Sequence, residues 1–181
     1  MNKLKSSADR KAILADYGIG LCEAQAVFIK ESDNQGFHPS TGALKIRFEA
    51  HLFKAATGHL IETGEGTQAE MWKAYMEAYK IDKEQAMFCT SFGIAQILGS
   101  NFKNCGYKSV QQMVAEFSLS EYFQIKGFGR FITTESDKTK TLKAHEWADF
   151  ARLYNGLKYA KNKYDIDIQA NYERCSDNLK K

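Results

Sequence analysis

The sequence predicts a mainly α protein that folds as a single domain over residues 1–181. Apolar residues recur at helical spacing along most of the chain, whereas the period-two alternation typical of strands is scarce. Only one residue is Pro, so few positions would break a helix. No internal repeat or Pro/Ser-rich linker divides the chain. A chain of this length buries roughly 70% of its unfolded surface, which is enough for one hydrophobic core.

The first half of the chain is expected to form helices over residues 7–17, 21–31, 49–56, 68–80 and 82–89. The clearest apolar faces are Ile13, Leu14 and Tyr17; Leu21, Ala24, Val27 and Phe28; and Met71, Trp72, Tyr75 and Tyr79. Gly18 and Gly58 end two of these helices, and Asp82 caps the last. Residues 33–43 and 58–67 are rich in loop-forming residues, and 45–48 suit a short strand or an extended lead-in.

The second half is expected to be helical over residues 109–117, 120–133, 143–154 and 163–179. Asn155 and Gly156 stop the third of these segments. Residues 92–98 are apolar and lie between glycines, which suggests a short helix or turn. Any β structure should therefore be small.

Net charge and hydropathy restrict the classes of partner. The chain carries a net charge of +3 and has a pI of about 8.5, which suits an anionic partner such as a cell wall or simply favours solubility. No Arg-rich stripe indicates nucleic-acid binding. The first ten residues lack the apolar core of a signal peptide, and no stretch approaches about 18 apolar residues. We therefore expect a soluble, monomeric protein made in the cytoplasm, without stable membrane insertion.

The cysteines and histidines give no metal signature. Cys22, Cys89, Cys105 and Cys175 lie far apart with no CxxC pair, and the histidines form no ligand set with nearby acids. An even number of cysteines permits two disulfides, but the lack of an export signal favours free thiols. No metal ion or organic cofactor is expected.

Glu31 is the strongest catalytic candidate in the sequence. It follows an apolar helical run and precedes Ser32 and a loop, so its carboxyl should be half walled by apolar groups and half open to a cleft. Apolar walls raise the pKa of a carboxyl. A carboxyl that keeps its proton near neutral pH is the group needed to break a glycosidic bond.

Several further motifs accompany Glu31 in order. They are Lys30-Glu31-Ser32 with Gly36-Phe37, the segment from Ile46 to Phe53 (IRFEAHLF), residues 91–101 (SFGIAQILGSN), Gly106-Tyr107, Phe150 to Gly156 (FARLYNG), and Asn162 with Tyr164. Together these resemble the lysozyme-like superfamily, and most closely the phage endolysin N-acetylmuramidases. The resemblance covers roughly residues 8–175. Phe92 replaces the usual Trp of the third motif, and Ala50 a usual Arg of the second.

The resemblance implies a lysozyme-like helical domain that cleaves peptidoglycan glycan strands at the β-1,4 bond between N-acetylmuramic acid and N-acetylglucosamine. Glu31 would protonate the leaving oxygen. Glu49 is the first candidate for a second catalytic group, although it could instead be a structural partner of Arg47 or His51. Substrate-binding candidates are Phe37, Phe92, Gln96, Asn101, Tyr154 and Asn155, of which the two phenylalanines could equally be core. The enzyme would act in the periplasm, reached through a phage-made membrane lesion.

Two alternatives remain open. A lytic transglycosylase uses the same acid but lets the muramic 6-hydroxyl attack, which leaves an anhydro product. A non-catalytic wall-binding protein would keep the fold and bind walls without cutting them.

Overall fold

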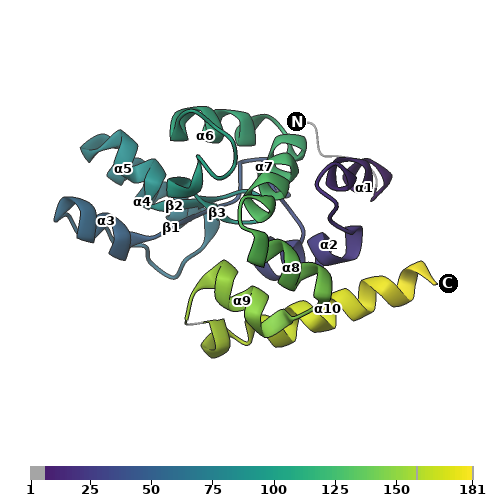
Figure 1. Cartoon of the computed structure of the whole chain (residues 1–181). Helices are drawn as coiled ribbons and strands as arrows, with labels where there is room; N and C mark the ends of the chain where they lie inside the picture. The colour runs from purple at the N-terminus through teal and green to yellow at the C-terminus, as the bar shows by residue number, and fades with distance from the viewer. Residues whose placement is uncertain (1–6, 158, 181) are drawn as a thin grey trace.

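The computed structural model describes residues 7–157 and 159–180. Over these residues the protein is mainly helical with one small sheet, which confirms the predicted fold class (Figure 1). The elements are α1 (Ser7–Ala15), α2 (Leu21–Ser32), β1 (Ile46–Phe48), α3 (Ala50–Thr57), α4 (Gln68–Ile81), α5 (Lys83–Phe88), β2 (Thr90–Phe92), β3 (Ile97–Leu98), the 3₁₀ turn η1 (Gly99–Asn101), α6 (Val110–Leu119), α7 (Glu121–Thr133), α8 (Ser136–Ala144), α9 (Trp147–Asn155), η2 (Tyr159–Asn162) and α10 (Tyr164–Leu179).

The sheet is antiparallel with strand order β1-β2-β3. Ile46 pairs with Phe92 across β1 and β2, and Ser91 pairs with Leu98 across β2 and β3. Residues 93–96 therefore form a turn, which is one of the two predicted alternatives, but this turn joins two strands of a hairpin that was not predicted. All three residues of β2 are buried, so the strand lacks the alternation that would have revealed it.

The core gathers around α7, which is flanked by α1, α6 and α8 (Figure 1). Phe28 of α2 meets Phe128 of α7 edge to face, with ring centroids 4.9 Å apart. The rings of Phe117 and Tyr17 also pack closely on α7, because Gly127 and Gly129 carry no side chain: a Cβ at Gly129 would lie 2.3 Å from the Tyr17 ring. The two glycines that looked like interruptions in the sequence are thus packing positions within one continuous helix.

The predicted helix over residues 143–154 spans the end of α8 and all but the last residue of α9. His145 separates them, because it adopts the left-handed conformation with φ of 57°. Its imidazole is held by Glu23, with Nε2 and Oε1 3.1 Å apart, and stacks on Trp147. Most residues of α8 are polar, so no apolar face in the sequence indicated this helix.

Helices α2 and α10 pack against each other in opposite directions. A disulfide joins Cys22 at the start of α2 to Cys175 near the end of α10. The expectation of free thiols is therefore wrong for this pair, whereas Cys89 and Cys105 are free and buried. The two bridged residues are 153 positions apart, so only the packing of the helices reveals their proximity. Within the described residues, no helix combines the length and apolar character needed to cross a membrane.

Candidate active site

Glu31 lies on the last turn of α2, at the point where the helix meets the β2–β3 turn. The helix ends because Asp33 turns left-handed, with φ of 55°. The next residue after Glu31, Ser32, is buried, and its hydroxyl donates to the carbonyl oxygen of Ile94 over 2.7 Å. The backbone that carries Glu31 is thus fastened to the hairpin on one side and remains part of a helix on the other.

The environment of Glu31 favours its protonated form. Burial raises the pKa of its carboxyl to about 8, and the nearby charges of Arg47 and Lys30 only partly oppose this. The phenol of Tyr164, the first residue of α10, donates a hydrogen bond to Oε1 of Glu31. Lys30 is itself engaged, because its ammonium contacts Asp167 at 2.5 Å and the carbonyl oxygen of Asn162 at 3.0 Å. A carboxyl in this state can donate a proton to a leaving oxygen at neutral pH.

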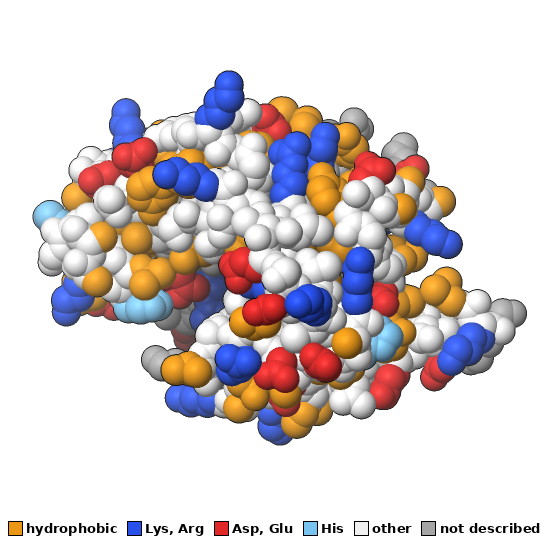
Figure 2. Space-filling view, viewed as in Figure 1, with side chains coloured by type: hydrophobic (Ala, Val, Ile, Leu, Met, Phe, Trp, Pro, Cys, Tyr) orange, Lys and Arg blue, Asp and Glu red, His pale blue; other side chains and the backbone are white. Residues whose placement is uncertain are grey.

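Glu31 lies where two halves of a groove meet. One half has a volume of about 380 Å³ and the other about 470 Å³, and both are lined by Glu31, Arg47 and Gln96. The first half continues past Glu49 and Asn101, and the second continues along the 63–66 loop. Figure 2 shows the molecule hollowed between the part that holds α3 and the part that holds α9, with charged side chains of both signs at the hollow. A groove open on both sides of the acid can hold a chain that extends in both directions.

Glu49 faces the first half of this groove from the start of α3. Its carboxylate lies 3.3 Å from Nε of Arg47 and 3.7 Å from Nδ1 of His51. Glu49 therefore pairs with both Arg47 and His51, the two structural partners considered from the sequence. The side chain of Glu49 is 22% exposed, so the carboxylate still reaches the groove. The two acids named from the sequence thus line one cavity.

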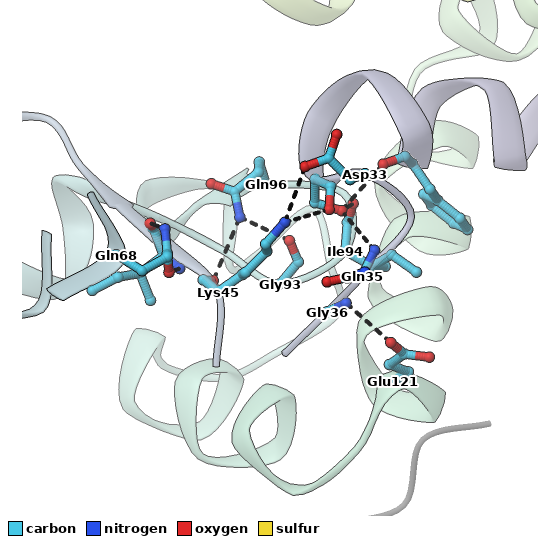
Figure 3. Close-up of polar contacts among 12 residues, drawn as sticks. Asp33, Gln35, Gly36, Lys45, Gln68, Gly93, Ile94, Gln96 and Glu121 are labelled. Atoms are coloured by element: carbon cyan, nitrogen blue, oxygen red, sulfur yellow. Dashed lines mark hydrogen bonds and ion pairs between the residues drawn. The ribbon is translucent and has the colours of Figure 1, made fainter. Parts of the chain in front are cut away.

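Gln96 is placed by an unusual backbone conformation, with φ of 44° at the β2–β3 turn. Its Nε2 donates to the carbonyl oxygens of Gly93, at 2.8 Å, and Lys45, at 3.4 Å (Figure 3). Lys45 in turn donates to the carbonyl oxygen of Ser32 over 2.6 Å. These bonds commit the amide nitrogen to the protein and leave the carbonyl oxygen of Gln96 as the group that can meet a ligand.

Three more predicted binding residues line the same half of the groove as Glu49. They are Asn101 at the end of η1, and Tyr154 and Asn155 at the end of α9. The phenol of Tyr154 donates to the carbonyl oxygen of Ala95 over 2.8 Å. Burial, together with the charge of Glu31, raises the pKa of this phenol well above its ordinary value, so it stays neutral. Asn155 is exposed and ends its helix.

Phe37 and Phe92 are not in the groove, contrary to one of the two alternatives open from the sequence. Each is 1% exposed and part of the core, and neither lines either half of the groove. Phe92 packs edge to face on Tyr75. A ring enclosed in this way cannot stack on a sugar, so the prediction of a substrate contact is wrong for both. The replacement of the family's Trp by Phe92 is consequently a change in the core.

Two residues of the site were given no catalytic or binding role from the sequence. Tyr164 contacts Glu31 directly, and Arg47 lines both halves of the groove. Arg47 stands in a motif beside Glu49, which is the signal that could have identified it. Tyr164 stands with Asn162 in the last of the matched motifs, but it follows Glu31 by 133 positions, so the motif alone did not indicate a contact with the acid. The described part of the chain contains no cluster of three or more His, Cys, Asp or Glu residues suited to a metal ion.

A helical domain with a small hairpin and a protonated carboxyl midway along a groove defines a glycoside hydrolase of the lysozyme type. The family model for N-acetylmuramidases matches residues 21–176, and the chain belongs to this family. Among solved structures, the endolysin of Burkholderia phage AP3 is similar, with a TM-score of 0.79 and 30% sequence identity. The match covers 96% of this chain and 71% of that one. No curated protein sequence matches the chain.

Proposed function

We propose that this protein is an endolysin-type muramidase that hydrolyses the β-1,4 bond between N-acetylmuramic acid and N-acetylglucosamine, with Glu31 as general acid. The observation that carries the proposal is the position of Glu31 at the junction of the two halves of the groove, where burial raises the pKa of its carboxyl to about 8. At neutral pH the carboxyl holds a proton that it can give to the leaving oxygen as the bond breaks. The similarity to a phage endolysin supports a role in opening the host wall from the periplasmic side.

The form of the groove supports a polymeric substrate. Because Glu31, Arg47 and Gln96 line both halves, a glycan strand laid along the groove would place sugars on either side of the acid. The amide groups of Gln96, Asn101 and Asn155 suit the N-acetyl and hydroxyl groups of those sugars. We assign these residues to substrate binding.

We assign the second catalytic role to Glu49. Water must attack the oxocarbenium-like centre after the leaving oxygen is protonated, and a carboxylate can activate that water or stabilise the charge. Glu49 lines the same cavity as Glu31, and Arg47 and His51 hold it beside the groove. Asp33 fits this role poorly, because it ends α2, is largely exposed and pairs with Lys45.

The test is mass spectrometry of the soluble products released from purified peptidoglycan by the wild type and by Glu31→Gln. We expect reducing muramic acid ends from the wild type and at least a hundredfold fewer from the variant, since general acids contribute about 10²–10⁴-fold. Anhydro-muramic ends would reassign the protein to the lytic transglycosylases. No products from the wild type would leave a wall-binding protein.

A second pair of variants tests Glu49. Glu49→Gln keeps the shape but removes the charge, and Glu49→Asp keeps the charge on a shorter side chain. We expect the first to lose activity on peptidoglycan and the second to retain part of it, with circular dichroism unchanged in both. Full activity of Glu49→Gln would remove Glu49 from the mechanism and leave the substrate's own groups to assist.

A further inference from the structure

A third cavity continues the groove beyond Glu49. Its volume is about 480 Å³, and it lies between α3, α5 and the segment that follows β3. The lining residues are Leu52, Gln85, Phe88, Cys89, Leu98, Ser100 and Phe102. The rings of Phe88 and Phe102 are nearly parallel, with an interplanar angle of 17° and centroids 6.0 Å apart. Both side chains are half-buried and so retain some exposed ring surface.

This cavity is continuous with the groove that contains Glu31. Leu52 and Leu98 line both the third cavity and the half of the groove that holds Glu49. Asn101 of that half is a direct neighbour in the chain of Ser100 and Phe102. A strand that lies across Glu31 and passes Glu49 would therefore reach the two phenylalanines next.

The chemistry of the lining selects a neutral ligand with an apolar face. None of its side chains is charged, and its polar groups are the amide of Gln85 and the hydroxyl of Ser100. The only charge recorded against these rings among the described residues is Lys103, whose Nζ lies 5.8 Å from the centroid of Phe102. Stem peptides carry carboxylates, which would lose water here without gaining an ion-pair partner in the lining. An N-acetylated hexose is neutral, and its ring hydrogens and acetyl methyl form an apolar surface.

We infer that the third cavity is a subsite for an N-acetylglucosamine ring of the same glycan strand, remote from the cleaved bond, with Phe88 and Phe102 against the sugar. The inference rests on the proposed function, because it takes a glycan strand to occupy the groove. Phe88 and Phe102 would then make the aromatic contact with a sugar that the buried Phe37 and Phe92 cannot make. Binding energy gained so far from the reacting bond would make long strands better substrates than short ones.

Binding to the inactive Glu31→Gln protein tests the subsite without relying on cleavage. Isothermal titration calorimetry would compare a peptide-free tetrasaccharide with longer strands, in peptide-free and in peptide-bearing form. Two further changes are added separately to this background. Ser100→Trp fills the cavity from an exposed position, and Phe102→Ala removes one ring. Tyr122→Ala is the matched control, because Tyr122 is a partly exposed aromatic residue of α7 that lines none of the three cavities.

We expect long strands to bind more tightly than the tetrasaccharide. Both cavity variants should reduce the ratio of these two affinities about three- to tenfold, because an aromatic contact contributes a free energy of that size. Affinity for the tetrasaccharide should stay within about twofold, and the control should change neither value. An unchanged advantage in Ser100→Trp would overturn the subsite. A loss seen only with peptide-bearing strands would also overturn it, by assigning the cavity to the stem peptide. Failure of the proposed hydrolysis would appear separately, as an absence of products from the wild type.

Discussion

Tyr164 donates its phenolic hydrogen to Oε1 of Glu31, so the first residue of α10 holds a carboxyl that belongs to the last turn of α2. The ring of Tyr164 is 6% exposed, and the ammonium of Lys30 lies 5.4 Å from its centroid. The orientation of the proposed acid therefore depends on how α10 docks.

Tyr164→Phe should lower kcat about ten- to a hundredfold while KM changes little, because a carboxyl that loses its partner spends less time aimed at the leaving oxygen. The hydroxyl stabilises the carboxylate, so its removal should also raise the pKa of Glu31 and shift the alkaline limb of the pH profile upward. Tyr172→Phe, on the same helix, is the control and should behave as wild type. A profile identical to wild type with unchanged kcat would contradict the assigned role of Tyr164.

Arg47 lowers the pKa of Glu31 against the larger effect of burial. Arg47→Leu should therefore raise that pKa further, so that activity persists to higher pH. Arg47→Lys keeps the positive charge, so the alkaline limb of its pH–activity profile should match that of wild type. The change also frees Glu49 from its ion pair with Nε of Arg47. The measurement is kcat/KM on peptidoglycan between pH 5 and 10. If the alkaline limb of the kcat/KM profile moves to lower pH in Arg47→Leu, this electrostatic account is refuted.

The same pKa predicts how stability depends on pH. The folded-state pKa of Glu31 is about 8, against 4.5 for the free side chain. Between these values the native state binds more protons than the unfolded state, so this residue makes stability fall as pH rises. Glu31→Gln removes the effect. Its free energy of unfolding should exceed that of wild type by a few kcal/mol near pH 9, and the excess should largely vanish below pH 4.5. Urea denaturation of both proteins at several pH values measures this, and a constant difference would be inconsistent with a raised pKa.

The bridge between Cys22 and Cys175 should stabilise the docking of α10. Replacing both residues by Ser is expected to lower the free energy of unfolding by about 2–4 kcal/mol. Thermal melts with and without a reductant give the comparison: the reductant should lower the Tm of wild type and leave that of the double variant unchanged. Equal sensitivity of the two proteins would assign the effect to Cys89 or Cys105 instead.

Local signals in the sequence identified most helices and the position of Glu31. Asp82 caps α5 as expected, with its carboxylate accepting from the backbone of Glu84 and Gln85. The change from apolar to polar residues after Ile29 located the end of α2 within one residue. Such features depend only on residues close in the sequence, so they can be predicted without knowledge of the tertiary structure.

Features created by distant segments could not be predicted in this way. Whether Phe92 faces a ligand or the core depends on Tyr75, and Tyr164 reaches Glu31 only because α10 lies along α2. The disulfide has the same origin. The motifs supplied the candidate residues for the groove, but the packing of distant segments determines which candidates line it.

Gln124 has a consequence for anyone who reshapes this cleft by directed evolution. Its Oε1 accepts from the backbone of Ile94, and its Nε2 donates to the carbonyl oxygen of Phe117. A Cβ at Gly36 would lie 2.1 Å from Oε1 of Gln124, and one at Gly93 would lie 2.7 Å from its Cδ. Substitutions at these two glycines must therefore be accompanied by changes at Gln124. Libraries that vary the turn holding Gln96 should therefore diversify α7 at the same time. The 63–66 loop is coupled to α4 in the same way, because a Cβ at Gly64 would lie 2.3 Å from Oε1 of Glu70.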